Sequence, residues 1–231
     1  MSFTRRTIRC THTDHDYETY YEVSFKPGDS LLDSAKKLGF ERAQKVHPAG
    51  TDGRVRPPEV IVRRNILGVL AELVASEILK ETIRTKGVDA HIIQSGVSEI
   101  QEWGDTEIDI MLQVEDSVFE VEVRSSCLRN PLEWGITKGF DVIGWYTTQT
   151  KTVERRKDFY LRILYNFDEK DATEYIEKGI TLYFVGGASK TLLQGPRGYN
   201  TDLDQPGANY RCIKPICAAR DADKILNEIF G

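Results

Sequence analysis

Hydrophobic residues recur along this chain with two spacings, and each spacing predicts a different kind of element. Between residues 59 and 86 they recur every three or four positions, which predicts one long amphipathic helix that ends at Gly87. Between residues 118 and 125 they alternate with charged residues, so Phe119 and Val121 share one face of a predicted strand. The charged residues share the other face, which makes this strand the first place to look for chemistry.

The same two patterns assign most of the remaining chain. A helix is expected to have Ser30 as its N-cap and to stop at Gly39. Residues 194–210 are rich in Gly, Pro, Asn and Asp, which is typical of a long loop. In full, we expect strands at 17–26, 89–95, 107–114, 118–125, 141–146 and 180–185, and helices at 30–38, 59–86, 131–138, 152–166, 169–178 and 219–229.

The composition changes near residue 57. Residues 50–58 are rich in Gly, Pro and Arg, which is typical of a linker. We therefore expect two units, an N-terminal accessory unit of α+β type at 1–57 and a larger domain at 58–231.

Acidic residues gather at one end of the hairpin expected between residues 107 and 125. Glu107-Ile-Asp109 opens the first strand, a turn is expected at residues 115–117, and Glu122-Val-Arg124 lies in the second strand. Such a hairpin can hold Asp109 and Glu122 side by side. Two carboxylates at one spot repel each other unless a cation lies between them, and hard oxygen ligands suit Mg²⁺ or Mn²⁺. This chemistry indicates metal-assisted hydrolysis of a phosphodiester.

These motifs resemble the core of the PD-(D/E)XK nuclease superfamily, which includes many restriction endonucleases and DNA-repair nucleases. The resemblance covers roughly residues 60 to 150 and rests on an acidic-hydrophobic-Asp-hydrophobic run, a hairpin, and Glu122-Val-Arg-Ser-Ser126. It implies an α/β fold with a restriction-endonuclease-like αβββαβ core, a mixed sheet flanked by helices. The predicted helix in front of the hairpin also contains Glu72, which is similar to the acidic residue that the family's first helix often supplies.

The resemblance implies a divalent-metal-dependent deoxyribonuclease, of restriction or structure-specific type. Asp109 and Glu122 would bind Mg²⁺ or Mn²⁺, with Glu72 and Glu120 as supporting acids. Arg124 departs from the family pattern, which has Lys at this position. A guanidinium stays protonated, so Arg124 can clamp a phosphate and stabilise negative charge but is poorly suited to proton exchange. A homodimer is expected, because cutting both strands of a duplex needs two active sites.

Two alternatives remain open at this stage. Glu120-Val-Glu122 can itself be the working triplet, with Glu122 in place of the family's Lys. The chain can also be a non-catalytic DNA-binding or scaffolding protein that kept the fold and lost the lysine. Divalent-cation binding distinguishes the nuclease from the scaffold, since a scaffold has no need of two acidic residues that can bind a metal.

A basic run follows the predicted core. Arg155, Arg156 and Lys157 fall within the helix expected at 152–166 and are the candidate contacts to DNA phosphates. A plain solvated helix face is the alternative interpretation.

Composition sets the outer limits. The net charge of −5 argues against binding nucleic acid by overall charge, although a local basic surface can coexist with it. No apolar run approaches the length of a membrane span, the N-terminus lacks the apolar core of a signal peptide, and four scattered cysteines are too few for a disulfide framework. We expect a cytoplasmic protein without membrane contact.

Overall fold

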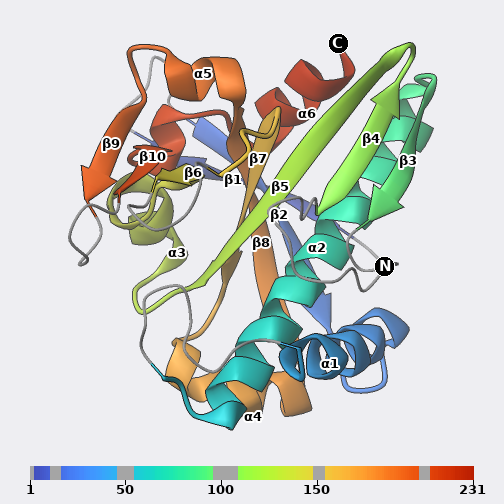
Figure 1. Cartoon of the computed structure of the whole chain (residues 1–231), viewed down its shortest axis with the longest axis vertical. Helices are drawn as coiled ribbons and strands as arrows, with labels where there is room; N and C mark the ends of the chain where they lie inside the picture. The colour runs from blue at the N-terminus through green and yellow to red at the C-terminus, as the bar shows by residue number, and fades with distance from the viewer. Residues whose placement is uncertain (1–2, 11–16, 46–54, 96–108, 148–153, 203–208) are drawn as a thin grey trace.

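The computed structural model describes residues 3–10, 17–45, 55–95, 109–147, 154–202 and 209–231 (Figure 1). Glu107, linker residues 50–54, residues 152–153 of the expected helix and residues 203–208 of the expected loop lie outside these ranges. The strands are β1 (Thr4–Arg9), β2 (Tyr17–Phe25), β3 (Ala90–Ser95), β4 (Ile110–Val114), β5 (Ser117–Cys127), β6 (Val142–Thr147), β7 (Phe159–Tyr165), β8 (Ile180–Ser189), β9 (Tyr199–Asp202) and β10 (Asn209–Ile213). The helices are α1 (Ser30–Ala43), α2 (Pro58–Lys86), α3 (Leu132–Trp134), α4 (Ala172–Lys178), α5 (Lys190–Gln194) and α6 (Ala222–Phe230).

The fold is α/β, as expected, and is built on a mixed sheet flanked by helices. Seven strands form this sheet in the order β1-β2-β8-β7-β5-β4-β3. β5 and β7 run parallel, whereas the other neighbouring strands are antiparallel. A second, antiparallel sheet has the order β6-β10-β9.

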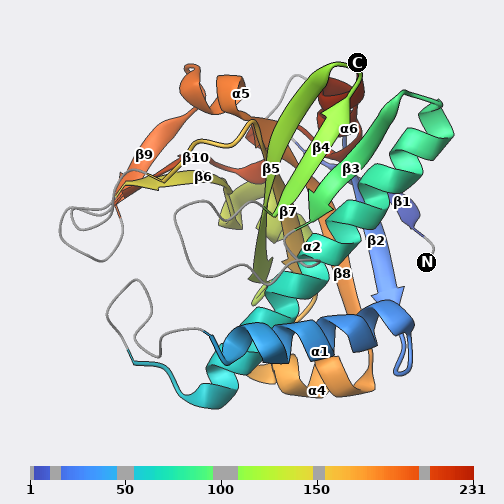
Figure 2. The same cartoon turned by 45° about the vertical axis from the view of Figure 1, so that its right-hand side comes forward.

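The two faces of the large sheet are covered differently. Helices α1, α2, α4 and α6 contribute to one hydrophobic core, together with Val121 of β5 and Leu161 of β7. On the opposite face, β6, β10, α5 and short helical turns form a second core with Tyr160 and Leu164 of β7. Figure 2 shows α2 on one side of the sheet and the small sheet on the other. Among the described helices, none is both long and apolar enough to cross a membrane.

The expected helix at 152–166 is wrong. Its core residues form strand β7 in the middle of the sheet, and all seven residues of β7 are buried. A strand covered on both faces carries large apolar residues at successive positions, so β7 lacks the alternation that identifies a half-exposed strand, although it includes the buried Arg162. Part of the expected loop at 194–210 is also regular structure, because β9 pairs with β10.

The described residues of the N-terminal part, 3–10 and 17–45, join the same sheet and core as the larger part of the chain. β2 pairs with β8, and β1 continues the sheet beyond β2. Helix α1 packs on α2 and runs on to Ala43, past the expected stop at Gly39. Gly39 instead allows close helix packing, because a Cβ there would collide with the backbone of Ile66.

Helix α2 agrees with its prediction at both ends. It begins at Pro58, whose missing N–H suits the first helical turn. It ends at Gly87, which adopts the left-handed conformation with φ of 64° and donates its N–H to the carbonyl of Ile83. The hairpin of β4 and β5 also forms as expected, with Glu115 in its turn at φ of 52°.

Candidate active site

Asp109 lies immediately before β4, and Glu122 lies on the neighbouring strand β5. Ile110 is paired with Val121, so in this antiparallel register the preceding residue, Asp109, lies across from Glu122. The Asp109 Oδ2 atom accepts a hydrogen bond of 2.7 Å from the backbone N–H of Val123. Each of the two acidic residues is only 8% exposed. The hairpin therefore holds two buried carboxylates beside each other.

The pleat of β5 decides which side of the sheet these carboxylates face. Val121 and Val123 pack into the core under α2. Glu120, Glu122 and Arg124 alternate with them, so they point to the opposite face, toward β6 and the small sheet.

Glu72 lies on the α2 side of the sheet. Its carboxylate accepts hydrogen bonds from both terminal nitrogens of Arg42 in α1, at 2.6 and 3.0 Å. This bidentate ion pair ties α1 to α2. The large sheet separates the side chain of Glu72 from that of Glu122. Glu72 therefore does not join Asp109 and Glu122 in one acidic cluster.

The environment of Glu122 disfavours its ionised form. Burial and the charge of Asp109 raise the pKa of Glu122 to about 8, although Arg124 and Lys157 act in the opposite direction. A carboxyl group with this pKa is mostly protonated at neutral pH. A divalent cation between the two acids would favour the ionised form of both.

Arg124 is held by carboxylates on two sides. Its Nη2 atom lies 3.1 Å from Glu122 Oε1 and 2.6 Å from Glu154 Oε1. The guanidinium also stacks on the ring of Tyr146, 5.0 Å from the centroid. Burial by itself lowers the pKa of Arg124, but the charges of Glu122 and Glu154 raise it above its usual value. Arg124 is therefore a permanently charged and positioned cation.

Lys157 lies in the site rather than on the surface. It is 2% exposed, its Nζ atom is 3.9 Å from Glu120 Oε2, and its charge lowers the pKa of Glu122. The extended segment before β7 places it there, because Asp158 exchanges backbone and side-chain hydrogen bonds with Glu120, each of 2.9 Å. Lys157 was expected on a helix, but the structure places it in an extended segment with its side chain buried.

The other two candidate phosphate contacts are exposed. Arg155 forms an ion pair with Glu120, and Arg156 stacks on the ring of Trp145 at 4.8 Å. Neither side chain lies on a helix. They flank the site at its solvent edge, where a phosphate backbone can reach them.

Sequence patterns did not identify Glu154 or the buried position of Lys157. The carboxylate of Glu154 accepts a hydrogen bond from the side chain of Arg124 and another, of 2.7 Å, from the backbone N–H of Tyr146. Glu154 therefore links β5 to β6. Both residues stand in a charged run that resembles a solvated helix. Only the parallel pairing of β5 with β7 brings this run to the carboxylates.

The donor set fits a hard cation held partly by its substrate. Within the described ranges, no group of three or more His, Cys, Asp or Glu residues is arranged to hold a metal ion. Asp109 and Glu122 form a pair. Mg²⁺ is commonly bound by one or two carboxylates plus waters and substrate phosphates, so a pair is a sufficient protein contribution.

Comparison with known proteins identifies a relative but no function. No family model matches the chain, and no solved structure matches it significantly. The chain is 27% identical over 225 residues to an uncharacterized protein of Methanocaldococcus jannaschii, a match that spans 86% of this chain and 80% of the relative.

Proposed function

We propose that this protein is a divalent-metal-dependent deoxyribonuclease with a restriction-endonuclease-like core. The observation that supports this most directly is the facing pair of buried carboxylates, Asp109 and Glu122, with the cations of Arg124 and Lys157 beside them. Acids that bind a metal and fixed cations that receive a phosphate are the parts that phosphodiester hydrolysis requires.

The order of elements supports the core assignment. Along the chain, α2, β3, β4, β5, the three-residue α3 and, after β6, β7 give a helix, three strands, a helix and a strand, which agrees with the αβββαβ order of the superfamily. β6 is an insertion in this series and belongs to the small sheet. Asp109 immediately precedes β4 and Glu122 lies on β5, which agrees with the resemblance.

Each residue of the site has a distinct proposed role. Asp109 and Glu122 would hold the divalent cation, which would supply Lewis-acid activation of water and of the scissile phosphate. Arg124, fixed by Glu154, stabilises the negative charge that develops on the phosphate oxygens. Lys157 supplies the compact ammonium group that the Glu-Val-Arg triplet lacks, from the segment before β7 instead of from β5.

The alternative register is less favoured by the pairing of the hairpin. Glu120 lies across from Met111 rather than from an acid, and it is engaged by Arg155 and Lys157. Glu120 therefore acts as the residue that positions Lys157, and Asp109 remains the partner of Glu122.

Supercoiled plasmid DNA incubated with the protein and Mg²⁺ or Mn²⁺ tests the proposal. Wild type should nick or linearise the plasmid, and linearisation would indicate two sites acting together. Asp109→Asn and Glu122→Gln should abolish cleavage, whereas Asp116→Asn, in the exposed turn of the same hairpin, should leave it unchanged. A wild-type protein that binds DNA and cleaves none with either metal would support the non-catalytic scaffold instead.

A further inference from the structure

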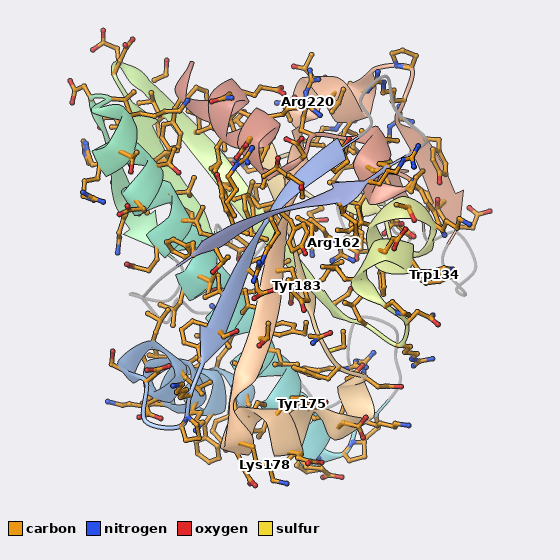
Figure 3. All side chains as sticks on the ribbon, turned by 180° about the vertical axis from the view of Figure 1, so that it is seen from behind. Trp134, Arg162, Tyr175, Lys178, Tyr183 and Arg220 are labelled. Atoms are coloured by element: carbon orange, nitrogen blue, oxygen red, sulfur yellow. The ribbon has the colours of Figure 1, made fainter. Side chains whose placement is uncertain are left out.

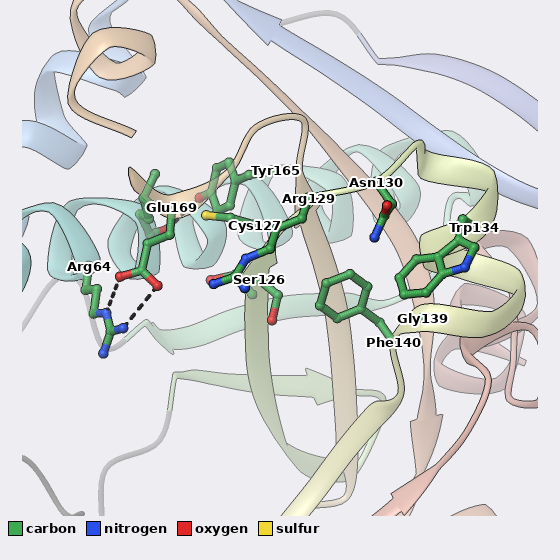
Figure 4. Close-up of a pocket in the computed structure, with 12 residues that line it drawn as sticks. Arg64, Ser126, Cys127, Arg129, Asn130, Trp134, Gly139, Phe140, Tyr165 and Glu169 are labelled. Carbon is green, nitrogen blue, oxygen red and sulfur yellow. Dashed lines mark hydrogen bonds and ion pairs between the residues drawn. The ribbon is translucent and has the colours of Figure 1, made fainter. Parts of the chain in front are cut away.

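A pocket of about 610 Å³ lies at the C-terminal end of β5 (Figure 4). Ser125, Ser126 and Cys127 of β5 form part of its wall. Ser126 lies four residues after Glu122 and on the same face of the strand, about 13 Å further along. A polymer bound at Glu122 would have to extend about 13 Å in the direction of β5 to reach the pocket.

One end of the pocket is aromatic. Trp134 is 44% exposed, and its indole ring packs on Gly139, where any Cβ would collide with the ring. The ring of Phe140 also lines this end, and Figure 4 shows it beside Trp134 with the amide of Asn130 near both. Because Gly139 has no side chain, the indole ring of Trp134 can lie against its backbone. This exposed ring belongs to neither hydrophobic core.

A buried cation lies behind this aromatic end. Arg162 is 1% exposed, stacks on Phe140 at 5.7 Å from the ring centroid, and donates a hydrogen bond of 2.9 Å to Ser126. Its Nε and Nη1 atoms have no hydrogen-bond partner among the described residues. Burial lowers the pKa of Arg162 to about 10, although Asp141 acts in the opposite direction. Figure 3 shows Arg162 in the interior and Trp134 toward the periphery.

Positive charge continues to the rim of the pocket. Arg124 and Arg162 are register partners on the neighbouring strands β5 and β7, and Arg162 contacts Ser126 of the pocket wall. At the pocket itself, the side chain of Arg129 is 78% exposed and lies 3.6 Å from Asp168. Arg64 lies at the far end, where Glu169 holds it by two hydrogen bonds of 2.5 and 3.0 Å.

We infer that this pocket binds one unpaired nucleotide of the nucleic-acid strand that the Asp109–Glu122 site cleaves, with its base on Trp134 and its phosphate at Arg129. The inference rests on the proposed nuclease function and narrows its substrate to DNA with unpaired nucleotides. An exposed indole stacks on any base, an amide can bond to a base edge, and an exposed guanidinium receives a phosphate. A peptide side chain would use the indole but has no need of the adjoining cations.

Binding measured apart from cleavage tests this inference. Fluorescence anisotropy in metal-free buffer compares a blunt duplex with the same duplex carrying a short single-stranded extension. Trp134→Ala should weaken binding of the extended duplex by about ten-fold or more, the scale of one lost base stack, and change the blunt duplex by less than about two-fold. Phe40→Ala, at another exposed aromatic residue on α1, is the matched control and should change neither affinity.

A second variant keeps the test decisive if Trp134→Ala fails to fold. Arg129→Ala changes an exposed side chain, and it should weaken binding of the extended duplex and reduce its salt slope by about one unit. Arg84→Ala, at an exposed arginine of α2, should leave both unchanged. If Trp134→Ala and Arg129→Ala bind both DNAs as wild type does, or lose affinity for both equally, the pocket does not bind an unpaired nucleotide.

The outcomes separate this inference from the proposed function. If the pocket variants lose affinity only for the extended duplex and the wild type cleaves no DNA, the nucleotide-binding pocket is supported and the nuclease function is overturned. Cleavage by a protein whose pocket variants bind normally would overturn the pocket alone.

Discussion

The carboxylate of Asp109 accepts a 2.7 Å hydrogen bond from the backbone N–H of Val123, the residue that follows Glu122. This bond anchors the end of β4 to β5, where the hairpin register places Asp109 across from Glu122. The metal-site hypothesis and the electrostatics of the hairpin both depend on it.

Asp109→Asn keeps an oxygen that can accept from Val123 but removes one charge. Because the charge of Asp109 raises the pKa of Glu122, this variant should lower that pKa from about 8 toward its usual value. It should also abolish Mn²⁺ binding. NMR titration of the Glu122 carboxyl group and calorimetry with Mn²⁺ measure the two effects. An unchanged Mn²⁺ affinity would remove Asp109 from the site.

The raised pKa of Glu122 predicts a specific pH dependence of stability in metal-free protein. The folded state holds this proton up to about pH 8, whereas the unfolded chain releases it near its usual pKa of 4.5. The free energy of unfolding should therefore fall as pH rises from about 5 to 8, by up to about 1.4 kcal/mol per pH unit, and then level off.

Denaturant unfolding at several pH values measures this slope. Glu122→Gln cannot ionise and should lose it, and saturating Mg²⁺ should reduce it in wild type. If the wild type and Glu122→Gln show the same slope, another group is responsible.

Lys157→Met keeps the length of the side chain and removes its charge. If Lys157 supplies the ammonium that Arg124 cannot replace, cleavage should fall about 10²-fold or more, the scale of one transition-state charge donor. Single-turnover cleavage measures this, and thermal unfolding confirms that the variant is folded. Lys178→Met, at an exposed lysine of α4, is the control and should cleave as wild type does. A folded Lys157→Met protein with wild-type cleavage would assign charge stabilisation to Arg124 alone.

Two glycines in helices predict opposite effects on stability. Gly39→Ala should destabilise the protein by about 1–3 kcal/mol, because its Cβ would meet the backbone of Ile66 and force α1 away from α2. Gly68→Ala should stabilise it by about 0.5–1 kcal/mol, because a Cβ there meets nothing within 4 Å and alanine suits the interior of α2. The denaturant midpoints of the two variants show whether stability falls for Gly39→Ala and rises for Gly68→Ala. Equal effects at the two positions would contradict the close contact of α1 with α2.

Local signals in the sequence determined the elements that are half exposed or have clear ends. α2 was predicted from its helical periodicity to span residues 59–86 and to end at Gly87, and it begins one residue earlier, at Pro58. The hairpin of β4 and β5 was predicted from strict alternation and its acidic turn, and this placed Asp109 near Glu122. Such signals are local because each depends on residues a few positions apart.

Tertiary structure decided the rest, because the remaining relationships join segments far apart in the chain. β7 is buried on both faces because cores form on both sides of the sheet, so its nearly continuous run of large apolar residues resembled a buried helix. Lys157 reaches the carboxylates because β7 pairs with β5, and Glu72 is kept from them by the intervening sheet. The pairing of β2 with β8 joins the N-terminal strands to the same sheet. Strand pairing is a non-local choice, and no short pattern in the sequence encodes it.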